Sequence, residues 1–125
     1  MSARPLLAAW ALAAFLAAGA GSAMAQVPKV METMPADRAV LNRASGDFYV
    51  RFDRPVDHIH SLLLIKQDGK VIQTLRPRFK TEPNVLFAMA PPLPPGAYAF
   101  HWSVHTLAGT EVIEGELPFT VSAPR

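Results

Sequence analysis

Four histidines are the side chains of this chain best suited to chemistry: His58, His60, His101 and His105. Imidazole is the commonest metal ligand in proteins and suits copper and zinc. His58 and His60 flank Ile59, so on a strand their rings point to the same side. The chain has no cysteine, which excludes thiolate metal sites and a cysteine nucleophile. The histidines are therefore the candidates for a metal site.

Catalytic constellations are missing from the sequence. No serine lies in a G-x-S-x-G turn, and no glycine loop of the phosphate-binding kind occurs. Glu114 and Glu116 share the outward face of an expected strand, where solvated carboxylates are commoner than a catalytic pair. We therefore expect a binding protein and not an enzyme.

Methionine thioethers are a second source of metal ligands, because Cu(I) prefers soft donors. The spacing of Met31 and Met34 does not place both on one strand face. We expect Met31 to fill the core and Met34 to lie in the turn before Pro35. Met89 alternates with Phe87, and we expect both to lie in the core.

Short strands must position these side chains. Tyr98, Phe100, Trp102 and Val104 fall on every second position, so one side of a strand buries all four. Asp68-Gly69 is a hairpin signal. Extended segments are expected at residues 27–31, 48–52, 62–66, 71–75, 85–89, 98–105 and 113–121. About seven such strands predict an all-β fold, an immunoglobulin-like antiparallel β-sandwich of the Greek-key type.

The predicted core is dominated by aromatic and aliphatic side chains of these strands. Its expected members are Phe48, Phe52, Leu63, Val71, Phe87, Tyr98, Trp102 and Phe119.

Residues 1–25 are typical of a secretory signal peptide. Arg4 precedes an apolar run over residues 6–18 that is too short to span a membrane, and Ala23-Met24-Ala25 forms a cleavage site. Glycines and a serine at residues 19–22 interrupt the run, which disfavours the alternative of an uncleaved anchor. We expect export to the periplasm, a single domain at residues 26–125 and no membrane insertion after cleavage.

The charge of that domain is nearly balanced. Eleven basic residues stand against ten acidic ones once Arg4 is removed. Arg76, Arg78 and Lys80 alternate at strand spacing, which is more typical of a solvated face than of a nucleic-acid contact. We expect no nucleic-acid partner.

Several motifs in order resemble the copper resistance protein C (CopC) family of periplasmic copper-binding domains. The segment at residues 27–37 resembles the family's first strand and P-A-D turn, and residues 50–56 resemble its L-x-F-S-E-x-V element. The hairpin at residues 67–70, the strand of residues 93–102 and the closing residues 117–121 also match. The resemblance covers essentially residues 26–125, and it implies the sandwich fold, the periplasm and a role in copper homeostasis.

The family's usual Cu(II) ligands are not retained. The N-terminal His corresponds to Val27, the acidic residue to Arg54, and the Asp and His of the D-G-H turn to Ala108 and Thr110. Cu(II) favours nitrogen and oxygen donors in a tetragonal arrangement, and these four side chains do not supply them. A cluster of methionines after Asp68-Gly69 is also missing.

In the topology that the resemblance implies, His58, His60 and His105 lie near the same end of the sandwich. They are the predicted ligands of an altered copper site, with His101 as a surface residue or a fourth ligand. The alternative is that these histidines are solvated and have no specific role. Two functions follow: a CopC-like carrier that binds copper weakly and passes it to a copper-transporting membrane protein or a periplasmic partner, or a metal-free interaction module that has lost the copper site.

Overall fold

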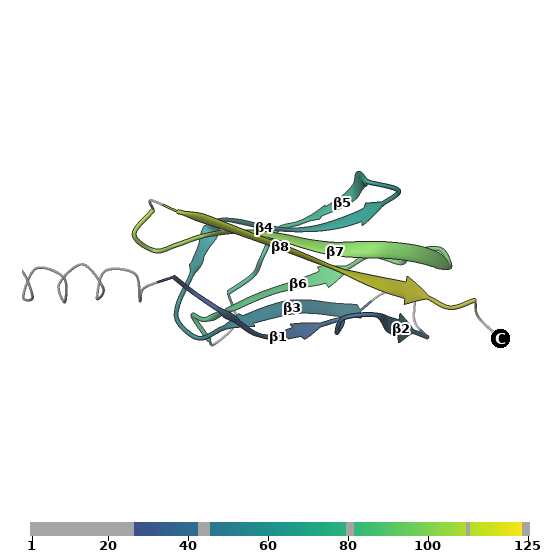
Figure 1. Cartoon of the computed structure of the whole chain (residues 1–125), viewed down its shortest axis with the longest axis horizontal. Coiled ribbons are helices and arrows are strands. Elements are labelled where there is room, and N and C mark those ends of the chain that lie inside the picture. The colour runs from purple at the N-terminus through teal and green to yellow at the C-terminus, as the bar shows by residue number, and fades with distance from the viewer. Residues whose placement is uncertain (1–26, 43–45, 80–81, 110, 124–125) are drawn as a thin grey trace, which may run out of the picture.

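The structure, a computed structural model, describes residues 27–42, 46–79, 82–109 and 111–123. These residues form eight strands arranged in two layers (Figure 1). The strands are β1 (Val30–Met34), β2 (Ala39–Leu41), β3 (Gly46–Phe52), β4 (Asp57–Gln67), β5 (Lys70–Leu75), β6 (Val85–Ala90), β7 (Gly96–His105) and β8 (Val112–Val121).

One sheet has the strand order β1-β3-β6 and the other the order β2-β8-β7-β4-β5. All pairs are antiparallel except β2 with β8. The predicted all-β, immunoglobulin-like sandwich is confirmed. The strand β2 was not predicted, because three residues carry too little alternation to indicate a strand. Its partner segment, Phe119–Val121, lies about 80 residues later in the chain.

Alternation on β7 places its large side chains in the core, as predicted. Phe100 and Val104 are fully buried, and Trp102 is 7% exposed. Phe48 from the other sheet meets Phe100 and Phe119 edge-on, with ring centroids 5.2 and 5.5 Å apart. Such aromatic pairs add to the hydrophobic stabilisation that joins the two layers.

Most of the predicted core is confirmed, because Phe48, Phe52, Leu63, Tyr98, Trp102 and Phe119 are buried in one cluster. Phe87 is buried as well, but on the opposite face of β6 and outside that cluster. Val71 is an error: its side chain is 49% exposed. The β4–β5 ladder shifts register between Ile65 and Lys66, so Val71 pairs with Lys66 and is out of phase with the inward-facing Leu75.

Two methionines were also assigned wrongly to the core. Met31 is 65% exposed and Met89 is 59% exposed. On β6 the inward residues are Leu86, Ala88 and Ala90, so Met89 points outward.

The first strand begins three residues later than expected, at Val30, and it includes Met34 as its last residue. Met34 therefore does not belong to the turn. The predicted signal peptide, residues 1–25, lies outside the described residues. Among the described residues there is no helix with the length and apolar character that a membrane crossing requires.

The ends of the sandwich differ in their connections. The β3–β4 and β7–β8 connections lie together at one end, and the β4–β5 hairpin lies at the other (Figure 1). His58, His60 and His105 are all close to the first end, because β4 begins there and β7 finishes there.

Candidate metal centre

An irregular pairing of β4 with β7 assembles the candidate centre. Asp57 pairs with His105, and the next regular pair is Leu62 with Ser103. Val104 alone therefore faces residues 58–61 of β4, which bulge away from the ladder. A bulge re-aims side chains, and here it brings His60 back over the end of β7.

The rings of His60 and His105 are neighbours. Their centroids lie 6.0 Å apart, with planes inclined by 50°. The side chain of His60 is 67% exposed, so a solute reaches it from solvent. The predicted convergence of these two histidines agrees with the geometry.

The carboxylate of Asp57 orients the ring of His60. Oδ2 of Asp57 lies 2.8 Å from Nδ1 of His60, while Oδ1 accepts the backbone N–H groups of Ile59 and His60 at 2.8 and 3.1 Å. The hydrogen bond from the His60 side chain is the main reason that the pKa of Asp57 falls from 3.8 to about 2. An ionised carboxylate at Nδ1 holds the proton there, which leaves the lone pair on Nε2 of a neutral ring.

Ser61 fixes the two strands at this point. Its side chain is 1% exposed, and its hydroxyl donates to the carbonyl oxygen of Asp57 and accepts the backbone N–H of His105 at 2.9 Å. One buried hydroxyl thus positions both the orienting carboxylate and the second histidine.

His58 is engaged elsewhere. Its Nδ1 lies 3.1 Å from the carbonyl oxygen of Val56, and its Nε2 lies 2.6 Å from that of Val85 on β6. Phe79 packs edge-on against the ring, with centroids 5.3 Å apart. A three-histidine site would therefore require the His58 ring to turn away from Val85.

His101 lies farther along β7 between two carboxylates. Its Nδ1 is 3.1 Å from Glu116 and its Nε2 is 3.3 Å from Glu114. Lys66 also pairs with Glu116 at 3.2 Å, and these contacts, led by the one from Lys66, hold the pKa of Glu116 below its ordinary value. Both ring nitrogens of His101 are thus occupied, which disfavours a role as a fourth ligand.

Two of the positions that correspond to the family's Cu(II) ligands lie together. Arg54 and Ala108 line one pocket of about 330 Å³, together with Pro28, next to Val27, and with Thr106 and Leu107. This lining offers a guanidinium and mostly apolar groups in place of imidazole and carboxylate, so it does not fit Cu(II). Thr110 lies outside the described residues.

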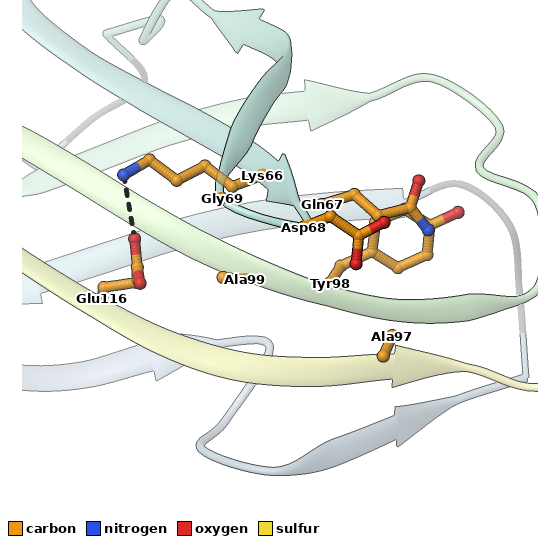
Figure 2. A pocket seen from close by; sticks show the side chains of 8 residues that line it. All are labelled: Lys66, Gln67, Asp68, Gly69, Ala97, Tyr98, Ala99 and Glu116. Carbon is orange, nitrogen blue, oxygen red and sulfur yellow. Dashed lines mark ion pairs between the residues drawn. The ribbon is translucent and has the colours of Figure 1, made fainter.

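Two further hollows lie among the described residues. A pocket of about 270 Å³ lies beside the β4–β5 hairpin. Figure 2 shows the Lys66–Glu116 ion pair on one side of it and Asp68 and Tyr98 on the other. A groove of about 700 Å³ is lined by Met34, Phe48 and Met89 among others. Over residues 27–42, 46–79, 82–109 and 111–123, no group of three or more His, Asp or Glu is arranged to hold a metal ion.

Two contributors to the centre were not predicted as such. In the sequence, only the position of Asp57 beside His58 suggested a part for it in a metal site. Nothing in the sequence suggested such a part for Ser61. The carboxylate three residues before His60 becomes its partner only because β4 bulges there.

Comparison with known proteins identifies the family of this chain. A family model described as the CopC domain matches residues 30–122. Among the curated proteins, none matches this sequence.

Two solved structures share the fold. CopC from Methylosinus trichosporium OB3b superposes with a TM-score of 0.69 at 22% identity, over 77% of this chain and 94% of that protein. PcoC, a copper resistance protein from Escherichia coli, superposes with a TM-score of 0.53 at 16% identity, over 75% of this chain and 99% of that one. At these identities the likeness concerns the fold.

Proposed function

Because the chain belongs to the CopC family, we propose that it handles copper in the periplasm, binding the ion at His60 and His105. The family match supports copper as the cargo. The observation that carries the choice of residues is the adjacency of the two imidazoles at the open end of the sandwich, with centroids 6.0 Å apart.

A relocated site is needed because the usual position is unsuitable. Arg54 places a positive charge in the pocket where the family's ligands would converge, and Ala108 contributes no donor. His105 directly precedes Thr106 and Leu107, which line this pocket, and His60 lies beside His105.

The hydrogen bonding around His60 supports a ligand role. Metal-bound histidines usually donate their second ring N–H to a carboxylate or carbonyl, which fixes the ring and raises its basicity. Asp57 supplies that partner at 2.8 Å. His58 becomes a third ligand only if its ring leaves the Val85 carbonyl.

Exposure of the pair supports exchange of the cargo with another protein. Ile59, beside His60, is 83% exposed, and Leu107, two residues after His105, is 66% exposed. Apolar side chains around an exposed site suit transient docking. We propose a copper-transporting membrane protein or a periplasmic copper carrier as the partner, and a binding role in place of catalysis.

Export is part of the proposal. We propose that residues 1–25 are removed and that the mature chain begins at Gln26. The intact mass of the protein recovered from the periplasm tests this, and a periplasmic species that retains residues 1–25 would contradict it.

The test of copper binding uses histidine signals in NMR spectra. Titration with a diamagnetic Cu(I) complex should shift the imidazole signals of His60 and His105, and should leave those of His101 in place because Glu114 and Glu116 hold that ring. His58→Ala decides whether a third histidine takes part. Uniform or absent shifts would refute the site.

A metal-free interaction module is the second candidate. It is favoured by the lack of any three-donor group within the described part of the chain. If neither Cu(I) nor Cu(II) perturbs the histidines, this function becomes the better one.

A further inference from the structure

The separation of the two rings carries information about the metal's oxidation state, and this inference rests on the copper site proposed above. A metal–nitrogen bond of about 2.0–2.1 Å and a ring radius of about 1.1 Å place each centroid about 3.15 Å from a shared ion. The largest possible centroid separation is then about 6.3 Å, reached when the two nitrogens lie opposite each other.

The observed 6.0 Å is close to that limit. With one nitrogen of each ring directed at a shared ion, this separation would correspond to a nitrogen–metal–nitrogen angle of about 145°, whereas a tetrahedral angle would bring the centroids to about 5.1 Å and a right angle to about 4.5 Å. In that arrangement the two donors would lie nearly opposite each other, as they do around a two-coordinate ion. Cu(II) prefers a tetragonal set, in which neighbouring donors lie near right angles.

The number of donors points the same way. Both oxygens of Asp57 already accept hydrogen bonds, Oδ1 from two backbone N–H groups and Oδ2 from His60. Asp57 cannot become a third ligand through Oδ2 without releasing the ring that it orients. Both nitrogens of His58 face carbonyl oxygens.

Charged groups beyond the pair do not complete a Cu(II) site. Arg54 is the nearest charged member of the neighbouring pocket, and its guanidinium pairs with Asp53 at 3.3 Å. Over the described residues, no third His, Asp or Glu joins the pair in a metal-binding group. A Cu(II) ion held here would take half or more of its coordination sphere from water.

We propose that the His60–His105 pair is a two-coordinate site selective for monovalent copper over divalent copper. A filled d shell imposes no geometry of its own, so a closed-shell monovalent ion accepts two opposed imidazoles, and Ag(I) serves as its redox-inert substitute. The selectivity comes from the span of the pair and from the small number of free donors.

The experiment measures both oxidation states on the purified protein. Cu(I) affinity is determined without oxygen by competition with bicinchoninate, Ag(I) binding by calorimetry, and Cu(II) affinity by competition with glycine. We expect one Cu(I) or Ag(I) per chain, bound at least about tenfold more tightly than Cu(II). His60→Ala and His105→Ala should each weaken Cu(I) binding by more than about 100-fold, the upper end of the loss seen for an outer hydrogen-bond partner.

His101→Ala is the matched control, because it removes a histidine of the same strand whose nitrogens are already paired. It should leave both affinities unchanged. X-ray absorption of the Cu(I) form should show two nitrogen neighbours, and three or more neighbours, or sulfur, would overturn the inference.

The remaining outcomes separate the inference from the function on which it rests. Cu(II) bound at least as tightly as Cu(I), and lost in His60→Ala and His105→Ala, would overturn the selectivity while leaving the copper site in place. Copper binding that is absent, or that neither variant affects, would overturn the site itself and the selectivity with it.

Discussion

The indole of Trp102 lies directly over Gly115, its cross-strand partner on β8. A Cβ built on Gly115 would sit 2.3 Å from Cζ2 and 2.5 Å from Nε1 of the indole. A glycine inside a strand often marks the close approach of another group, and here that group is a buried ring. The two residues therefore specify each other.

Gly115→Ala should destabilise the domain by about 1–3 kcal/mol, because the indole must leave its rotamer or the strands must separate. For a domain of this size, the melting temperature should fall by about 4–8 °C for each kcal/mol. The double variant Gly115→Ala with Trp102→Leu tests the cause. The stability lost in the double variant should be smaller than the sum of the losses in the two single variants. Strict additivity would show that the contact between Trp102 and residue 115 does not cause the destabilisation.

Trp102→Ala should remove about 3–5 kcal/mol, the usual range for deleting a large buried aromatic. The indole is 7% exposed and meets Phe100 at a centroid distance of 5.6 Å. The free energy of unfolding of a small domain is about 5–15 kcal/mol in total, so denaturant titration should find the variant barely folded. An unchanged unfolding midpoint would contradict the burial of this face.

Ser61→Ala should cost about 1–3 kcal/mol, because it leaves the backbone N–H of His105 without its buried partner. It should also weaken copper binding, since the same hydroxyl holds the carbonyl of Asp57. Ser103→Ala, a serine two residues before His105, is the control for stability and affinity. Equal effects of the two substitutions would argue against a special role for Ser61.

Acid should remove the contribution of Asp57 to stability. Its pKa is lowered from 3.8 to about 2, so the folded state binds its proton less readily than the unfolded chain. Such a carboxyl stabilises the fold above pH 3.8, and the benefit disappears as the pH falls from about 4 to about 2. The difference in stability between the wild type and Asp57→Asn, measured by urea unfolding, should shrink over that interval. A difference that stays constant over this pH interval would contradict the lowered pKa of Asp57.

Copper binding should weaken as the pH is lowered, because protons compete with the metal for the ligand nitrogens. Affinity measured between pH 5 and 8 checks this. Asp57→Asn should lower the affinity by about 10–100-fold at neutral pH, because an amide nitrogen in place of Oδ2 cannot accept the His60 proton. A pH-independent affinity would point to ligands other than histidine.

The β6 strand illustrates the limit of reading strands from sequence. Residues 85–90 are all apolar, so alternation alone does not tell which phase faces the core. The true inward set is Leu86, Ala88 and Ala90, and Phe87 is buried on the opposite face. Arg78 forms an isolated bridge with Phe87, a pairing that the alternation of β6 does not reveal. On β7, by contrast, large side chains alternate with small and polar ones, and the predicted face is confirmed.

The candidate centre was predictable in part. Two-residue spacing and the ends of the expected strands suggested that the histidines gather at one end of the sandwich. The bulge at residues 58–61 decided which of them meet, and a bulge depends on the pairing of two strands more than 40 residues apart. For that reason the sequence favoured His58 equally with His60, although His58 turns to the carbonyl of Val85.

The short parallel strand β2 also determines how this protein meets other chains. It covers β8 at Phe119–Val121, and the backbone N–H of Arg38 donates to the carbonyl of Pro118 at 2.8 Å. Toward its start, the outer edge of β8 carries Glu114 and Glu116, and Pro118 itself has no N–H to offer. Charge and proline at an edge oppose the addition of a further strand. The longest hairpin of the fold thus presents little template for aggregation, while the end that carries His60 and His105 remains open to solvent.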